Sequence, residues 1–130
     1  MTPRTPPPWQ RAGGRGFAAE APPGRFIVEV SPWAEGTVLA LYGELDLDSV
    51  AELLAALDPA LDEPATVVVV DCAGLEFCDS SGLNALLRAQ ARAADDGSRI
   101  ELARPRALVL RMLELTGATD AFRIRATPPA

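Results

Sequence analysis

The feature that most constrains the fold is a short, almost uninterrupted run of valines in the middle of the chain. Residues 66–71 read T-V-V-V-V-D. Branched residues of this kind favour extended backbone, and a continuous apolar run is typical of a strand that is covered on both faces. Strands of this type occur mainly in α/β proteins. The run therefore predicts a central strand of a mostly parallel sheet.

Strand-like and helix-like patterns alternate along the chain on both sides of this run. Apolar residues at helical spacing separate most of the strand-like runs, and turn-forming residues between the first two predict a β-hairpin. The predicted strands are residues 25–30, 37–42, 66–71, 99–103 and 122–126, and the predicted helices begin near Ser49, Ser80 and Pro105.

This order, β-β-α-β-α-β-α-β, places the chain in the α/β class. Strands that are connected through a helix run parallel, whereas the opening hairpin is antiparallel. We therefore expect one domain over residues 25–130, with helices on a mixed, mostly parallel sheet.

Local signals predict where the helices begin and end. Ser49 and Glu52 have the spacing of a capping box at the start of the first helix. The second helix is expected over residues 80–94. Pro105 suits the first position of the third helix, and Gly117 suits its end.

Residues 1–24 differ in composition from the rest of the chain. They hold six prolines and four glycines together with three arginines. A segment of this kind has too little apolar surface to offset the entropy lost on ordering. We expect a disordered tail that is rich in proline, glycine and arginine.

The composition excludes several classes of function. The chain has no histidine, so it has no Ser-His-Asp or Cys-His catalytic machinery and no zinc site with histidine ligands. Its net charge is −6, which argues against nucleic acid as a partner. Cys72 and Cys78 do not have the C-x-x-C spacing of a redox motif, and we expect them to be reduced and mostly buried. We expect no metal and no cofactor.

The expected location is the cytoplasm. No stretch approaches the ~20 apolar residues of a membrane span. The first residues contain no apolar segment of the kind found in secretory signals. We therefore expect no contact with a membrane.

One segment carries residues with functional chemistry. Asp79, Ser80, Ser81 and Gly82 follow the valine strand at the start of the second helix. On one interpretation, Asp79 or Ser80 only caps the helix. On the other, a serine here accepts a phosphoryl group, which the free N–H groups and the positive end of the helix dipole would stabilise. Gly82 is expected to allow a partner to approach closely.

Two motifs together resemble those of a known family. G-E-L-D at residues 43–46 and D-S-S-G-L at residues 79–83 occur in this order, and L-T-G follows at residues 115–117. The chain resembles the anti-sigma factor antagonists of the STAS domain family over about residues 25–126. The proline-rich leader and the lack of another helix after the last strand depart from the family pattern.

The resemblance implies a switch, with no catalytic residues in this chain. A serine-kinase anti-sigma factor, a GHKL-type ATPase, would phosphorylate Ser81, and a serine phosphatase would reverse the mark. The unphosphorylated form would bind the kinase and so release a sigma factor. Asp79, Ser80 and Gly82 fall on the remaining motif positions. Asp46 falls on a residue that the family keeps near the phosphoserine, although it could equally cap the following helix.

The resemblance also allows a second function. Some STAS domains are unphosphorylated structural subunits, such as the cytoplasmic subunit of a bacterial lipid-transport ATPase. Those subunits often lack the second serine of the motif, so Ser81 favours the switch. The chain contains no P-loop lysine motif and no D-F-G or H-R-D motif, and we therefore expect no kinase activity of its own.

Overall fold

The computed structural model describes residues 25–130, which form five strands and three helices. The tail expected at residues 1–24 lies outside the described residues. The strands are β1 (Ile27–Trp33), β2 (Gly36–Leu45), β3 (Val67–Cys78), β4 (Arg99–Ala103) and β5 (Arg123–Arg125), and the helices are α3 (Val50–Leu61), α4 (Ser80–Asp95) and α5 (Ala107–Leu115). The predicted order of elements is confirmed.

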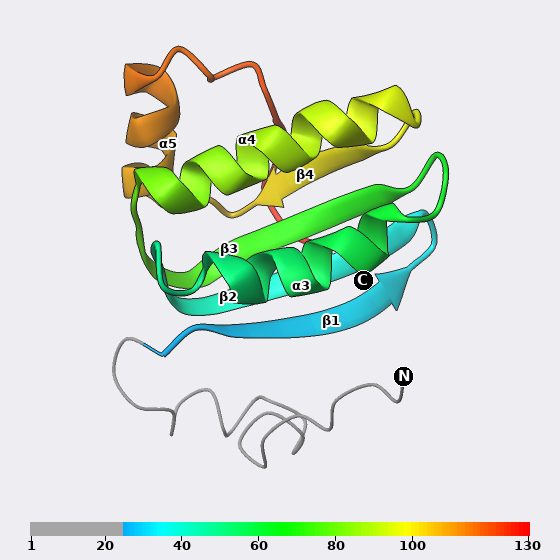
Figure 1. The fold of residues 1–130 in the computed structure, drawn as a ribbon, viewed down its shortest axis with the longest axis horizontal. Coiled ribbons are helices and arrows are strands. Elements are labelled where there is room, and N and C mark those ends of the chain that lie inside the picture. The colour runs from blue at the N-terminus through cyan, green and yellow to red at the C-terminus, as the bar shows by residue number, and fades with distance from the viewer. Residues whose placement is uncertain (1–24) are drawn as a thin grey trace.

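The strands form one sheet in the order β1-β2-β3-β4-β5 (Figure 1). β1 pairs with β2 antiparallel, and every later neighbour is parallel. The opening hairpin and the parallel strands therefore both follow the prediction. β3, which contains the valine run, lies in the middle of the sheet.

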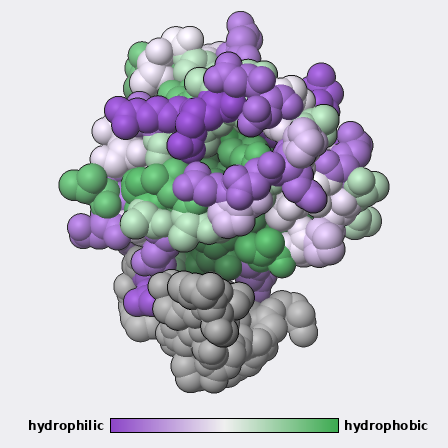
Figure 2. Space-filling view, turned by 45° about the vertical axis from the view of Figure 1, so that its right-hand side comes forward, coloured by the Kyte–Doolittle hydropathy of each residue, from purple (hydrophilic) through white to green (hydrophobic). Residues whose placement is uncertain are grey.

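α3 and α4 lie side by side on one face of the sheet, and α5 lies near the start of α4 (Figure 1). All three helices bury leucine or valine side chains in the core between helices and sheet, for example Leu53, Leu86 and Leu113. Val68 and Val70 of β3 enter the same core from the sheet side. The view in Figure 2 shows hydrophobic side chains between hydrophilic ones across the middle of the molecule.

The other face of the sheet is closed without a helix from the described residues. Val67 and Val69 are buried there in a small apolar cluster with Val38 and Ala103, against which Trp33 packs. The side chains of β3 are therefore buried on both faces, as the valine run predicts. On the face opposite the helices, β3 is covered by side chains instead of a helical layer.

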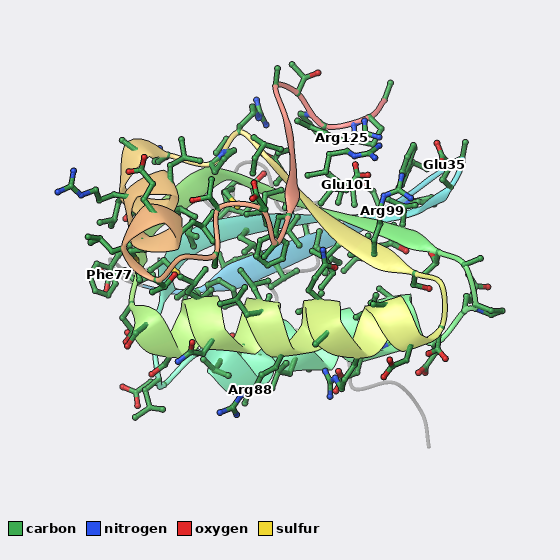
Figure 3. The ribbon with its side chains drawn as sticks, turned by 90° about the horizontal axis from the view of Figure 1, so that it is seen from above. Glu35, Phe77, Arg88, Arg99, Glu101 and Arg125 are labelled. Atoms are coloured by element: carbon green, nitrogen blue, oxygen red, sulfur yellow. The ribbon has the colours of Figure 1, made fainter. Side chains whose placement is uncertain are left out.

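A buried carboxylate extends this second face. Glu101 of β4 is fully buried and accepts hydrogen bonds from Arg125 and from Arg99, the latter at 2.6 Å (Figure 3). The Arg125 guanidinium lies 5.0 Å from the centre of the Trp33 ring, within the range of a cation–π contact. Burial alone raises the pKa of Glu101, but the two arginine hydrogen bonds outweigh it, so the pKa is lowered.

Several expectations about element ends are wrong, and β1 and β2 each run three residues further than predicted, to Trp33 and Leu45. β3 continues beyond Asp71 to Cys78, because Cys72, Leu75 and Cys78 bury their side chains in the core along the extended strand. Ser49 is the residue before α3, but its side chain makes no capping hydrogen bond, since its hydroxyl oxygen accepts from the Asp46 N–H at 2.9 Å and its proton is donated to the Glu44 carbonyl. α5 begins at Ala107, so Pro105 precedes the helix and does not occupy its first position.

Candidate functional site

The two sequence motifs lie next to each other at the carboxyl edge of the sheet. β2 ends at Leu45 and β3 ends at Cys78, and these two residues are partners in the parallel register. The Asp79 N–H donates a hydrogen bond of 3.1 Å to the Leu45 carbonyl. The G-E-L-D and D-S-S-G segments are therefore joined directly, at the position where open α/β sheets commonly bind ligands.

Asp79 caps helix α4. Its backbone is extended, and its Oδ1 accepts a hydrogen bond of 3.0 Å from the Gly82 N–H. This satisfies one of the N–H groups that the first turn of a helix leaves free. The capping interpretation of Asp79 is thus confirmed, and the carboxylate is held close to Ser80 and Ser81.

Gly82 faces the interior of the protein. It is buried, and a Cβ at this position would lie 2.5 Å from the Leu45 Cγ and 3.2 Å from the Cys78 Sγ. The absence of a side chain therefore lets the first turn of α4 sit against the end of β2. We expected Gly82 to let a partner approach closely. This expectation is wrong, because the Leu45 side chain fills the space beside the Gly82 Cα.

Asp46 holds the turn between β2 and α3. Its Oδ1 accepts hydrogen bonds from the Asp48 N–H at 3.0 Å and from the Ser49 N–H at 3.2 Å. The Ser49 hydroxyl also lies 3.2 Å from this oxygen. Of the two roles that the sequence allows for Asp46, the one that the contacts support is local, because the carboxylate organises the loop that leads into α3.

The two serines occupy the first two positions of α4 and differ in exposure. Ser80 is exposed, whereas Ser81 is half-buried at the mouth of a groove between α3 and α4. Within residues 25–130, neither hydroxyl has a hydrogen-bond partner. A serine hydroxyl that makes no hydrogen bond at the start of a helix is available to accept a phosphoryl group. A negative group placed there is stabilised by the helix N-terminus.

The groove beside Ser81 has a volume of about 380 Å³ and is lined by both apolar and cationic side chains. Leu47, Val50 and Leu54 line the α3 side. Arg88 and Arg92 lie along α4, at increasing distance from Ser81. This groove was not predicted from the sequence. The sequence does contain one signal for it, which is Leu47, an apolar residue between two aspartates in a loop. Leu47 is 74% exposed.

The cysteines lie below the site and are not reactive groups. Both thiols are free and buried. Burial raises the pKa of Cys72 to about 12 and that of Cys78 to about 11. Since the thiolate is the nucleophilic form, both side chains are protonated and unreactive at neutral pH. The expectation of reduced, buried cysteines is confirmed.

The described residues contain no group of three or more histidine, cysteine, aspartate or glutamate side chains that could hold a metal ion. No helix in residues 25–130 is both long enough and apolar enough to cross a membrane. What the site offers chemically is two serine hydroxyls, a capped helix start and an adjacent groove.

Several solved structures share this fold. An anti-sigma factor antagonist from Mycobacterium paratuberculosis superposes with a TM-score of 0.72 at 22% identity, over 82% of this chain and 91% of that one. The anti-sigma factor antagonist SpoIIAA in its unphosphorylated form gives 0.64 at 22% identity, over 76% of this chain and 88% of that one. The phosphorylated Bacillus SpoIIAA gives 0.61 at 23% identity, over 78% and 92%. The comparison with curated protein sequences gave no significant match.

The family assignment comes from the sequence itself. The model of a family described as "Mlab, STAS domain" matches residues 30–125, which span nearly the whole described domain and both motifs. The element order and the sheet agree with the solved STAS proteins. The chain therefore belongs to the STAS domain family.

Proposed function

We propose that this protein is an anti-sigma factor antagonist that is switched by phosphorylation of Ser81. In its unphosphorylated form it binds a serine-kinase anti-sigma factor, which then releases a sigma factor, and transcription changes as a result. The observation that carries the proposal is the position of Ser81, whose hydroxyl has no hydrogen-bond partner among the described residues, at the start of α4 and beside a groove.

Phosphoryl transfer uses groups from both the kinase and this chain. The Ser81 oxygen attacks the γ-phosphorus of ATP that is bound to the kinase, the bond to the bridging oxygen breaks, and ADP leaves. The hydroxyl proton passes to a base on the kinase. A serine phosphatase later hydrolyses the phosphoserine. This chain supplies the acceptor and is not itself an enzyme.

Asp79, Gly82 and Asp46 hold Ser81 in position. Asp79 fixes the first turn of α4 through its hydrogen bond to Gly82, and Gly82 lets that turn approach β2. Asp46 orders the neighbouring loop. Together they set the place at which a kinase finds the hydroxyl, while exposed Ser80 is a flanking residue.

Phosphorylation changes binding and leaves the fold intact. A phosphoryl group adds about −1.5 to −2 charges at neutral pH. A helix N-terminus favours a negative charge by ~0.3–1 kcal/mol, so the domain is not destabilised. At an interface, two like unit charges ~5 Å apart repel by roughly 3 kcal/mol at an effective dielectric constant of ~20. Because ~1.4 kcal/mol already corresponds to tenfold in affinity, even a screened repulsion is enough to release the partner.

The structural relatives agree with this proposal. SpoIIAA is described as an anti-sigma factor antagonist and was solved in unphosphorylated and phosphorylated forms, and both forms share the fold of this chain. The D-S-S-G motif at residues 79–82 supplies the acceptor serine in this chain.

The direct test is phosphoryl transfer. The full chain is incubated with each serine-kinase anti-sigma factor of the source organism and Mg²⁺-ATP, and the phosphorylated residue is mapped by mass spectrometry. We expect one kinase to modify the wild type and Ser80→Ala but not Ser81→Ala. Phosphate on Ser80 alone, or no transfer from any of these kinases, would contradict the proposal. The latter result would favour the alternative of a structural STAS subunit in a lipid-transport ATPase, which co-purification with that ATPase would detect.

A further inference from the structure

We propose that the groove between α3 and α4 binds an acidic amphipathic helix of the partner protein, with Arg88 selecting its charge. This inference rests on the proposed function, because it specifies the chemistry of the protein that docks beside Ser81. It concerns a surface that extends well beyond the motif residues, along the length of α4.

The groove has the shape of a channel between two helices. α3 and α4 lie side by side on the sheet (Figure 1), and Ala85 lies among the residues that line the space between them. At 1.5 Å per residue, the helical distance from Ser81 to Arg92 is about 16 Å, which is about three turns of helix. Arg92 forms an ion pair with Asp58 at 3.3 Å, which links α4 to α3 at the far end.

One wall of the groove is apolar. Val50 and Leu54 are partly buried against the core, and Leu47 extends the same wall into solvent. An exposed leucine at a groove mouth adds nothing to the core of its own domain. Burying it against a partner would gain free energy at about 25 cal/mol per Å² of apolar surface. This wall favours an occupant with an apolar face.

The opposite wall carries positive charge. Arg88 is exposed and has no ion-pair or hydrogen-bond partner within residues 25–130, and Figure 3 shows it extending from α4 away from the sheet. Arg92 lies one turn further and is paired with the exposed Asp58. A free cation beside an apolar wall complements a carboxylate on the flank of an apolar helix face.

The charged side chains among the residues that line the groove are both arginines, whereas the protein as a whole is acidic. The chain carries −6 overall, so an acidic partner is repelled at long range and attracted only where an arginine is within reach. Arg88 therefore acts as a specificity residue that fixes where an acidic helix docks. Ser81 lines the same groove, so a phosphoryl group on it would oppose that helix directly.

The test uses two synthetic helical peptides of about 14 residues, long enough to span the groove. Both have leucines along one face, and they differ only in carrying glutamates or lysines beside it. Binding to the full-length chain is measured by fluorescence anisotropy and mapped by amide chemical shifts. We expect the acidic peptide to bind more tightly than the basic one and to shift Ser81, Asn84 and Arg88.

Two variants test the groove directly. Arg88→Glu should weaken binding of the acidic peptide about tenfold, equivalent to ~1.4 kcal/mol, and should favour the basic peptide instead. Arg111→Glu makes the same charge change on α5, outside the groove, and should have little effect. Leu47→Ser should weaken both peptides, whereas Leu115→Ser, at a leucine that is 72% exposed on α5, should weaken neither.

Equal binding of the two peptides, or equal effects of Arg88→Glu and Arg111→Glu, would overturn the inference. A dimer of the full chain that Arg88→Glu dissociates would show that a second copy occupies the groove, which also overturns it. These outcomes are independent of the proposed function, because phosphoryl transfer to Ser81 is measured separately and requires no peptide.

Discussion

The Leu45 side chain occupies the space that a side chain at Gly82 would need. A Cβ on residue 82 would lie 2.5 Å from the Leu45 Cγ, which is closer than real Cβ contacts allow. This contact joins the last residue of β2 to the first turn of α4. It explains why glycine follows the two serines of the motif.

Replacing Gly82 by alanine should therefore destabilise the domain. Overpacking in a tight interior typically costs ~1–3 kcal/mol, and chemical denaturation measures the loss. Leu45→Ala should also be destabilising, by ~2–5 kcal/mol, through the cavity that it leaves. The two changes should be less than additive, since the smaller residue makes room for the new methyl group. Strict additivity would show that the two residues do not compete for this space.

Asp79 should contribute to stability through its cap and to recognition through its charge. Asp79→Ala removes the acceptor for the Gly82 N–H and should cost ~0.5–2 kcal/mol. Asp79→Asn keeps a good capping side chain, and its thermal midpoint should stay close to that of the wild type. If Asp79→Ala unfolds at the same temperature as the wild type and is phosphorylated at the same rate, the residue has neither role.

Ser81→Asp should weaken binding to the kinase without lowering the stability of the domain. A carboxylate in the first turn of α4 is favoured by the helix dipole, so the free energy of unfolding should match the wild type within ~0.5 kcal/mol. Binding to the kinase anti-sigma factor, measured by isothermal titration calorimetry, should weaken at least tenfold. Ser80→Asp is the matched control, because it adds the same charge one residue earlier at an exposed position. Full affinity of Ser81→Asp would contradict the switch mechanism.

Glu101 should make the domain sensitive to acid. Its pKa is lowered in the folded protein, so it stabilises the fold above the ordinary glutamate pKa of ~4.3, and this contribution is lost as the pH falls through the lowered value. At pH 7, Glu101→Gln should cost about 2 kcal/mol, since two charge-assisted hydrogen bonds lose their acceptor charge. Denaturation curves should show the difference between wild type and variant shrinking below about pH 4. A difference that is constant with pH would contradict this assignment.

Much of the fold follows from patterns that the sequence displays locally. The valine run predicted the central strand because an uninterrupted apolar stretch requires cover on both faces, and Val67 to Val70 are buried on both. Asp79 was recognised as a cap for the same local reason. Its bond to Gly82 involves only neighbouring residues.

The errors concern residues whose partners lie outside the local pattern. The end of β3 beyond Asp71 pairs with the end of β2, so its extended shape depends on a strand that local periodicity does not include. Ser49 had the correct spacing for a capping box, yet its hydroxyl bonds to Glu44, at the end of the preceding strand. The role of Gly82 in α4 depends on Leu45, which lies on β2.

The G-E-L-D and D-S-S-G segments both fall between Gly43 and Gly82, within the single β2-α3-β3 unit and the first turn of α4 that follows it. Several contacts that shape the site are made inside that stretch, through Leu45, Asp46 and Asp79, and the backbone of Arg25 lies against Gly43 from outside it. Ser81, the proposed acceptor, therefore lies at the end of one contiguous segment that contains both motifs. β5 pairs only with β4, at the far side of the sheet from β2, so variation in β5 should leave the geometry of this segment unchanged, and the segment is the one to transplant when a similar site is built into another parallel sheet.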